Sequence, residues 1–193
     1  MRQTIRHIVG IALSLLTLSC WAPEEFHATL NVDKTRRYQF VYEGTIVFAP
    51  ALEEIKKSGG LPPDADRELQ EAVLEMRNSP GFVNAEYVGR GRARVQFRES
   101  GVITSGKEVF LDLVKFNIDP AGRIRIQGAD ISLKDQQGMK NGGLKLDGTI
   151  RLTTSLTVVE HNAITTPWFG GLFGAYQWHV GIGQQQMPTI LMQ

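Results

Sequence analysis

The chain has 193 residues, with 21 Lys and Arg, 20 Asp and Glu, one cysteine and a formal net charge of +1. This balance excludes a protein that binds nucleic acid through overall positive charge. The length suffices for one domain with a normal core, and a single thiol excludes an internal disulfide framework.

Residues 1–19 have the features of a secretory signal peptide. Arg2, Arg6 and His7 form a basic start, and an apolar or small-residue run follows over residues 8–18. A run of about eleven residues is too short for a spanning helix, which needs roughly twenty. The pattern therefore predicts a signal peptide that is removed.

Cys20 ends the stretch Thr17-Leu18-Ser19-Cys20, which resembles the bacterial lipobox. The resemblance implies that Cys20 carries diacylglycerol on its sulfur and becomes the new N-terminus. The alternative is a small apolar residue in or just after an ordinary signal peptide. In the lipoprotein interpretation, residues 20–25 are the lipidated cysteine and a short tether. The tether reaches about 17 Å and places Trp21 at the level of the lipid headgroups.

The expected location follows from the residue after Cys20. It is Trp rather than Asp, and by resemblance to enterobacterial sorting this implies the outer membrane. The sequence therefore predicts a membrane-anchored lipoprotein of the cell envelope, at the outer membrane and facing the periplasm.

Residues 26–193 predict a single α+β domain that begins with a hairpin and two helices. Apolar residues alternate over 26–32 and again over 38–48, which predicts a β-hairpin. One helix is expected over 50–60, opened by Pro50 and ended by two glycines. The other begins with Asp64 or Asp66 as its cap and ends near Arg77.

The rest of the chain is rich in strand patterns. Residues 83–87 are expected to pair with 93–97, and 109–118 with 123–127 across a turn. An edge strand is expected at Ile131 and Leu133, then a polar loop over 136–143 and one long strand over 144–159. A strand over 176–182 and an edge segment over 188–193 complete the domain.

This order of elements predicts an α+β fold in which a curved antiparallel β-sheet has two helices inserted after the first hairpin. Such a sheet can leave a concave apolar space on its covered face. The expected core comprises Phe40, Tyr42, Leu69, Val73, Phe97, Phe116, Ile124, Ile126, Leu152 and Trp178.

Several of these features together resemble the mycobacterial LppM lipoprotein domain. They are the lipobox, a hairpin that starts Phe26-His-Ala-Thr-Leu30, a helical insert, and a late pair at 158–162 and 176–178. The resemblance spans about residues 20–183. It implies a fold similar to lipid-binding folds and a glycolipid as ligand. The C-terminal membrane helix expected in that family has no counterpart here, so the fold is expected to carry over and the ligand is not.

Residues for catalysis are few, and we expect no catalytic residue, no metal ligand and no cofactor. The sequence has no nucleophile elbow, phosphate-binding loop or His-Glu-x-x-His pattern. The histidines after the signal are His27, His161 and His179, and a catalytic metal needs three converging ligands. His161 and Asn162 are expected to make hydrogen bonds at a strand end. The sequence therefore predicts that the protein is not an enzyme.

Two groups of residues are candidates for a contact with a ligand or a membrane. Arg90, Arg92, Arg94 and Arg98 share one face of a predicted strand, and guanidinium groups bind phosphate and carboxylate. The alternative is a solvated face with cross-strand partners such as Glu86 or Glu108.

The second group is apolar and lies in a Gly-rich connection over 165–178. It consists of Trp168, Phe169, Leu172 and Phe173. A large apolar patch in a loop indicates a binding or membrane surface. The alternative is a lid that folds back on the core.

Two functions are compatible with this sequence. The first is a cell-envelope lipoprotein that binds a lipid, glycolipid or other amphiphile. The second is a structural or assembly lipoprotein that contacts a protein partner at the membrane. A solvent-accessible apolar cavity would favour the first, and a filled core with an exposed aromatic patch would favour the second. The expected partners are thus a membrane, through the lipid anchor, and an amphiphile or envelope protein, but no nucleic acid.

Overall fold

Two β-sheets form the body of the protein in the computed structural model, which describes residues 20–128, 133–168, 174–184 and 186–193. Sheet A contains, in spatial order, β10 (Tyr176–Gly181), β8 (Asp147–Thr154), β1 (Trp21–Val32), β2 (Arg37–Phe48), β4 (Arg92–Val102) and β3 (Phe82–Gly89). Sheet B contains β5 (Glu108–Val109), β6 (Val114–Ile118), β7 (Ile124–Gly128), β11 (Thr189–Met192) and β9 (Val158–His161).

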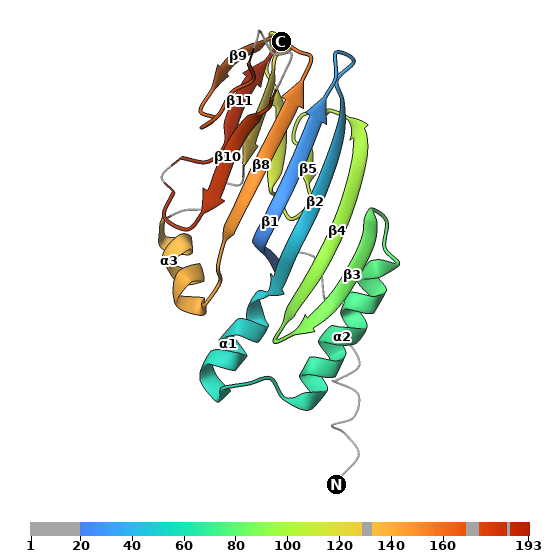
Figure 1. The fold of residues 1–193 in the computed structure, drawn as a ribbon, viewed down its shortest axis with the longest axis vertical. Helices are drawn as coiled ribbons and strands as arrows, with labels where there is room; N and C mark the ends of the chain where they lie inside the picture. The colour runs from blue at the N-terminus through green and yellow to red at the C-terminus, as the bar shows by residue number, and fades with distance from the viewer. Residues whose placement is uncertain (1–19, 129–132, 169–173, 185) are drawn as a thin grey trace.

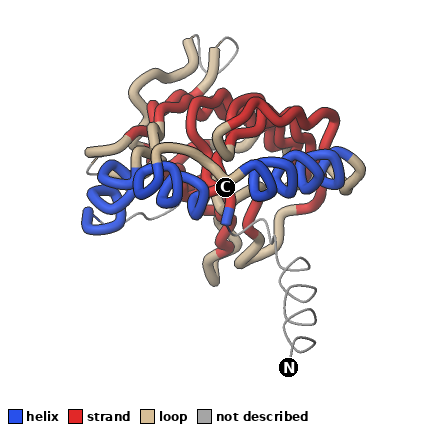
Figure 2. Tube along the Cα trace, turned by 90° about the horizontal axis from the view of Figure 1, so that it is seen from below, coloured by secondary structure: helices blue, strands red, loops and turns tan. Residues whose placement is uncertain are grey.

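The helices gather toward one end of the molecule. They are α1 (Ala49–Ser58), α2 (Pro63–Arg77) and α3 (Leu133–Gly142). Figure 1 shows α1 and α3 at one end of the long axis, α2 beside β3, and the C-terminus at the opposite end. Seen from the helical end, the helices form a row beneath a layer of strands (Figure 2).

The predicted fold class is confirmed, with three differences in detail. The described chain is α+β and its strands pair mostly antiparallel, as expected. However, the strands divide between two sheets, a third helix is present, and β1 pairs with β8 in parallel. Sheet B packs against the inner face of sheet A. Strands therefore cover most of the face that we expected the helices to cover.

The first hairpin is confirmed, but its first strand begins earlier than expected. Trp21 pairs with Phe48, and their ring centroids lie 5.5 Å apart. A bulge between Pro23 and Phe26 shifts the alternation by one position, which hides the continuation of the strand from the sequence pattern. Residues 21–25 therefore belong to β1, and the expected tether is wrong. Trp21 is 4% exposed, so its side chain is not available to lie among lipid headgroups.

Helices α1 and α2 are confirmed at nearly the expected bounds. Pro50 lies in the first turn of α1, and Gly59 ends it with a φ of 82°. The capping expectation for α2 is wrong, because Pro62 occupies the cap position without a side-chain hydrogen bond. Asp64 and Asp66 instead lie in the first turn, where a carboxylate favours the positive end of the helix dipole.

The segment after β7 departs most from expectation. Leu133 begins α3 rather than an edge strand, and Ile131 lies outside the described residues. The expected polar loop belongs mainly to this helix, which docks on α1 through a 2.8 Å hydrogen bond from Lys56 Nζ to the carbonyl of Asn141. Its glycines suggested a loop, but the tertiary contact overrides that weak tendency.

The C-terminal strands are also arranged differently. The expected long strand over 144–159 divides into β8 and β9, which belong to different sheets. The chain turns there because the N–H of Ser155 donates to the carbonyl of Val32 and that of Leu156 to the hydroxyl of Thr154. Strand β11 was expected at an edge, yet it pairs with both β7 and β9 inside sheet B.

The predicted core is confirmed at every position. All ten side chains are buried, with exposed fractions of 8% or less. The alternating apolar residues of β1 and β2 point to the inner face of sheet A, where they meet sheet B and α2. Polar residues of the same strands therefore lie on the outer face of sheet A.

Candidate functional site

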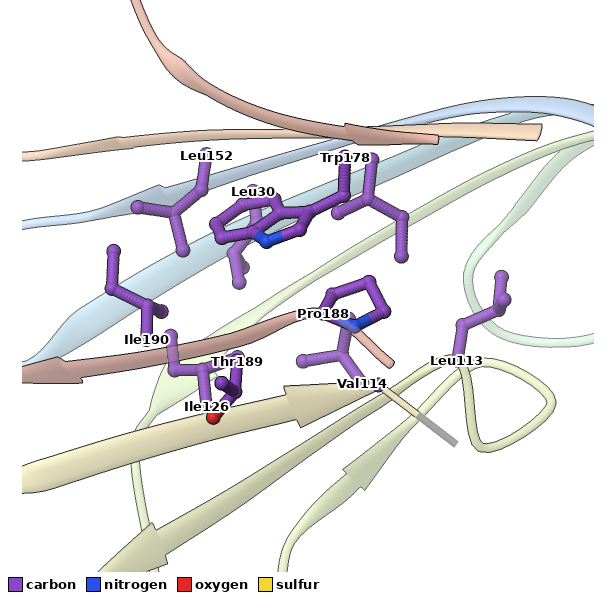
Figure 3. A pocket seen from close by; sticks show the side chains of 11 residues that line it. Leu30, Leu113, Val114, Ile126, Leu152, Trp178, Pro188, Thr189 and Ile190 are labelled. Carbon is purple, nitrogen blue, oxygen red and sulfur yellow. The ribbon is translucent and has the colours of Figure 1, made fainter. Parts of the chain in front are cut away.

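The described residues line a narrow slot between the two sheets. Figure 3 shows side chains from the two sheets pointing toward one another across a narrow slot, with Trp178 and Leu30 on one side and Val114 on the other. The lining residues are Leu30, Leu113, Val114, Ile126, Gly128, Ile150, Leu152, Trp178, Pro188, Thr189 and Ile190. The slot is apolar and partly open, but its volume of ≈ 10 Å³ is about the smallest that admits a single water molecule.

A hydrogen-bond network holds one wall of this slot. Trp178 Nε1 donates to Asn162 Oδ1 at 2.7 Å, and the N–H of Thr189 donates to the same oxygen at 2.8 Å. Asn162 Nδ2 donates to the carbonyl of Met187 at 2.8 Å. The N–H of Ala163 donates to His161 Nδ1. The expected hydrogen bonds of His161 and Asn162 at a strand end are therefore present, and they fix the ring of Trp178.

Arg92 is part of a buried ion pair rather than of a free row. Its Nε lies 2.6 Å from Glu24 Oε2, and its Nη2 lies 2.9 Å from Oε1. Glu24, which is 4% exposed, also accepts a hydrogen bond from the N–H of Lys145. The hydrogen bonds that Arg92 donates to Glu24 raise the pKa of Arg92, and burial together with the charge of Glu24 raises the pKa of Tyr42. Arg92 therefore has a structural partner, and the expectation of a headgroup contact is wrong for it.

The other three arginines are exposed. Arg90 lies in the β3–β4 turn at a φ of 55°, and Arg94 and Arg98 lie on the outer face of sheet A. Arg94 stands opposite Glu86 in the strand register, but neither it nor Arg98 has a carboxylate within 4.0 Å in the described part of the chain. Glu108, the other expected partner, pairs with Lys115 at 2.8 Å.

The exposed apolar segment is described only up to Trp168. That side chain is 73% exposed and Ile164, four residues earlier, is 70% exposed. For Trp168 the expected lid on the core is therefore wrong. Phe169, Leu172 and Phe173 lie outside the described residues.

Cys20 and Trp168 lie toward opposite ends of sheet A. Cys20 precedes the first residue of β1, whereas Thr165 forms a bridge with Gln177, which lies at the level of Thr29. Eight residues of strand separate Trp21 from Thr29, or about 26 Å. Arg90 and Arg92 lie at the Cys20 end, because β4 begins opposite Val47, one residue from the partner of Trp21.

A shallow groove on the outer face of sheet A brings together groups that the sequence keeps far apart. Glu25, His27, Glu43 and Asp147 line it because β1 lies between β2 and β8. His179 Nδ1 lies 3.7 Å from Asp147 Oδ1. Across the described residues, however, no three His, Cys, Asp or Glu side chains converge closely enough to hold a metal ion. His161 and His179 lie on strands of different sheets.

A second groove runs along the free edge of sheet A. It lies between α2 and β3, and its volume is ≈ 400 Å³. The sequence gives little indication of this groove. The groove depends on which strand lies at the edge of the sheet and on which side of that strand the helix packs. Within the described residues no helix is both long and apolar enough to cross a membrane.

Comparison with solved structures adds a structural likeness. No protein-family model and no curated protein matches the chain. The NMR structure of the folded domain of the Mycobacterium tuberculosis LppM protein is similar, with a TM-score of 0.43 and 12% sequence identity over 88% of this chain and 89% of that one. This confirms the weak resemblance expected from the sequence. Function must therefore be inferred from the residues of this chain.

Proposed function

We propose that the protein is a lipid-anchored envelope protein, without enzymatic activity, that contacts a protein partner through its exposed segment at Ile164 and Trp168. The observation that carries the proposal is the exposure of both side chains, 70% and 73%, together with the slot of only ≈ 10 Å³ that the described residues line between the sheets. An acyl chain cannot enter so small a slot unless the sheets move apart.

An exposed tryptophan suits a protein interface. Burial of a large aromatic side chain contributes strongly to binding, and tryptophan is enriched among the residues that dominate interface energies. Solvation of Trp168 and Ile164 in the free protein is unfavourable, so a partner that covers them gains the free energy of removing both from water.

The anchor gives this surface a defined location. In the proposed protein Cys20 carries the acyl chains, and β1 begins at the next residue, so the domain lies close to the bilayer of the outer membrane on its periplasmic side. The bridge at Thr165, three residues before Trp168, is then displaced about 26 Å along the strand direction from the anchored end.

Photo-crosslinking in the native cells tests this surface. A benzophenone amino acid replaces Trp168 in the full-length chain, and a matched variant carries it at Val102, which is 55% exposed on β4. We expect a discrete protein adduct from position 168 that is absent from position 102. Equal adducts from both positions, or none from position 168, would contradict the proposal.

A second function is favoured by the apolar lining of the slot. Residues of both sheets line it, and it is partly open, so a small separation of β6 and β11 from sheet A would admit an acyl chain. Native mass spectrometry of the protein from its own membranes should then detect a retained lipid. A Val114→Ile variant, which adds one methylene to the slot, should retain less lipid while still unfolding cooperatively, although at a lower temperature because the slot is nearly filled. A wild-type protein without lipid would exclude this function.

A further inference from the structure

Strand β3 is an unusually open edge of the molecule. It has eight residues, whereas the edge strands of sheet B, β5 and β9, have two and four. The other edge of sheet A, β10, is partly covered, because Gln177 exchanges backbone hydrogen bonds with Ile164 and Thr165. Among the described edges, β3 is therefore the longest, and backbone bonds beyond its own sheet are seen only at its first residue, Phe82.

The middle of β3 is regular enough to pair with another strand. Register shifts occur only near its ends, between Phe82 and Asn84 and between Tyr87 and Gly89. In the regular part between them, alternate residues direct their N–H and C=O groups away from β4. Natural proteins usually block such an edge with bulges, lysines or a covering segment, so an open stretch suggests a partner.

The groove beside this stretch has two walls. One wall is β3 itself, residues 84–87, and the other is a stripe of α2 formed by Gln70, Leu74 and Arg77. These three residues are spaced by four and three positions and so share one helix face. Leu74 is 54% exposed, which leaves an apolar surface opposite a free strand edge.

Contacts with the core and between α2 and β3 fix the two walls of the groove. Leu69, Val73 and Met76 bury the neighbouring face of α2, about 100° around the helix, in the core. Tyr87 donates its hydroxyl hydrogen to Asp66 of α2 and accepts a hydrogen bond from the N–H of Gly91 at 3.1 Å. The two walls therefore keep their spacing without a ligand, which reduces the entropic cost of binding.

Charge defines what the groove accepts. Ala85 and Tyr87 point toward the helix side, and Glu86 points to the outer face opposite Arg94. Arg77 is exposed on the helix wall, and no carboxylate of the described residues lies within 4.0 Å of it. An added strand would therefore meet Leu74 and Arg77 with one face and Glu86 with the other.

We propose that this groove binds an extended peptide segment of a partner protein, which adds to sheet A as a strand beside β3. Its helix-facing side chains are an apolar residue and an acidic residue two positions apart, and a basic residue between them faces Glu86. Main-chain hydrogen bonds supply affinity and the alternating side chains supply specificity. The site goes beyond the proposed function, because it lies at the edge of sheet A opposite the segment with Trp168.

A designed probe tests the proposal on the full-length protein in detergent. The probe is fluorescein-labelled Thr-Val-Lys-Asp-Thr-Val-amide, in which valine and aspartate share one face. Fluorescence anisotropy should show saturable binding, and hydrogen exchange should slow at residues 83–88. Leu74→Glu and Arg77→Glu should each weaken binding about tenfold or more. Val102→Glu, an equally exposed site elsewhere, should leave it unchanged.

Two further probes separate strand addition from general attraction. A peptide N-methylated at consecutive residues has no free strand edge, so it cannot pair with β3 and should not bind. A peptide with lysine in place of aspartate should prefer the Arg77→Glu variant. Binding of the methylated peptide, protection outside β3, or no binding of the first probe would overturn the proposal. Concentration-dependent dimerisation that Leu74→Glu abolishes would also overturn it, because the occupant would then be a second copy. None of these readouts involves Trp168, so the proposed function can fail independently.

Discussion

Glu24 determines the role of Arg92, because it holds that side chain in an ion pair. It lies in the bulge of β1, where the carboxylate turns to the outer face and is covered by Arg92 and the N–H of Lys145. A buried carboxylate without these partners would lose most of its solvation without compensation. The sequence offered Arg92 as a surface group only because the bulge, and with it the position of Glu24, is not visible in the alternation pattern.

The first prediction concerns this pair. Arg92→Ala should lower the free energy of unfolding by about 3–5 kcal/mol, because it leaves Glu24 buried without a counter-charge. Arg94→Ala, on the exposed part of the same strand face, should change it by less than about 0.5 kcal/mol. Urea unfolding measures both. A Glu24→Met and Arg92→Leu double variant should regain most of the loss, and equal midpoints for the two single variants would contradict the assignment.

The second prediction concerns Trp178, which is 5% exposed and is bonded to Asn162. Trp178→Ala should cost about 3–5 kcal/mol of stability, since it opens a cavity between the sheets. Trp178→Phe should cost less, because Asn162 Oδ1 keeps the hydrogen bond from Thr189. Thermal unfolding provides the measurement. A melting temperature of Trp178→Ala equal to that of the wild type would show that the indole does not support the core.

At the scale of elements, the periodicity of apolar residues predicted the helices and hairpins that form between neighbouring parts of the chain. The hairpin of β1 and β2, the pair β3 and β4, and helices α1 and α2 follow from alternation, from apolar spacing and from Pro and Gly at their ends. The parallel pairing of β1 with β8 could not be predicted, because it joins residues about 120 positions apart through no local signal. Without this pairing, the sequence cannot predict that β8 and β9 belong to different sheets, nor can it predict the grooves on sheet A.

The turn between β1 and β2 gives the third prediction. Asp33 accepts hydrogen bonds from the N–H and hydroxyl of Thr35 and from the N–H of Arg37, and these hold the pKa of Asp33 below its usual value. A folded-state pKa below the unfolded one means that the stabilisation is present above about pH 4 and is lost as the pH falls through the folded value.

The comparison uses Asp33→Asn. Asparagine keeps an acceptor oxygen but does not titrate, so the loss of stability between about pH 5 and pH 2 should be smaller in the variant than in the wild type. Denaturant midpoints over this range measure the difference. Parallel pH profiles for the two proteins would show that the turn carboxylate contributes no pH dependence.

At the scale of the whole molecule, the structure separates the two candidate contact surfaces. Cys20 and the β3–β4 turn with Arg90 lie at one end of sheet A, while the segment with Trp168 lies toward the other. The sequence made both surfaces candidates for contact with a ligand or a membrane, but nothing in it gives the distance between them. Because β1 begins at Trp21, an acyl chain on Cys20 would be attached next to the first residue of the sheet, with no tether between them.

The last prediction follows from this close attachment. If Cys20 is acylated, an alkyne fatty acid should label the wild type but not Cys20→Ala, which should leave the membrane fraction. In the labelled protein, a benzophenone amino acid at Arg90 should form phospholipid adducts on illumination, because the turn lies at the anchored end. The same group at Trp168, which follows the Thr165 bridge about 26 Å away along the strands, should form none. Lipid adducts at both positions would mean that the domain lies flat on the bilayer, and an unlabelled wild type would remove the anchor on which the orientation depends.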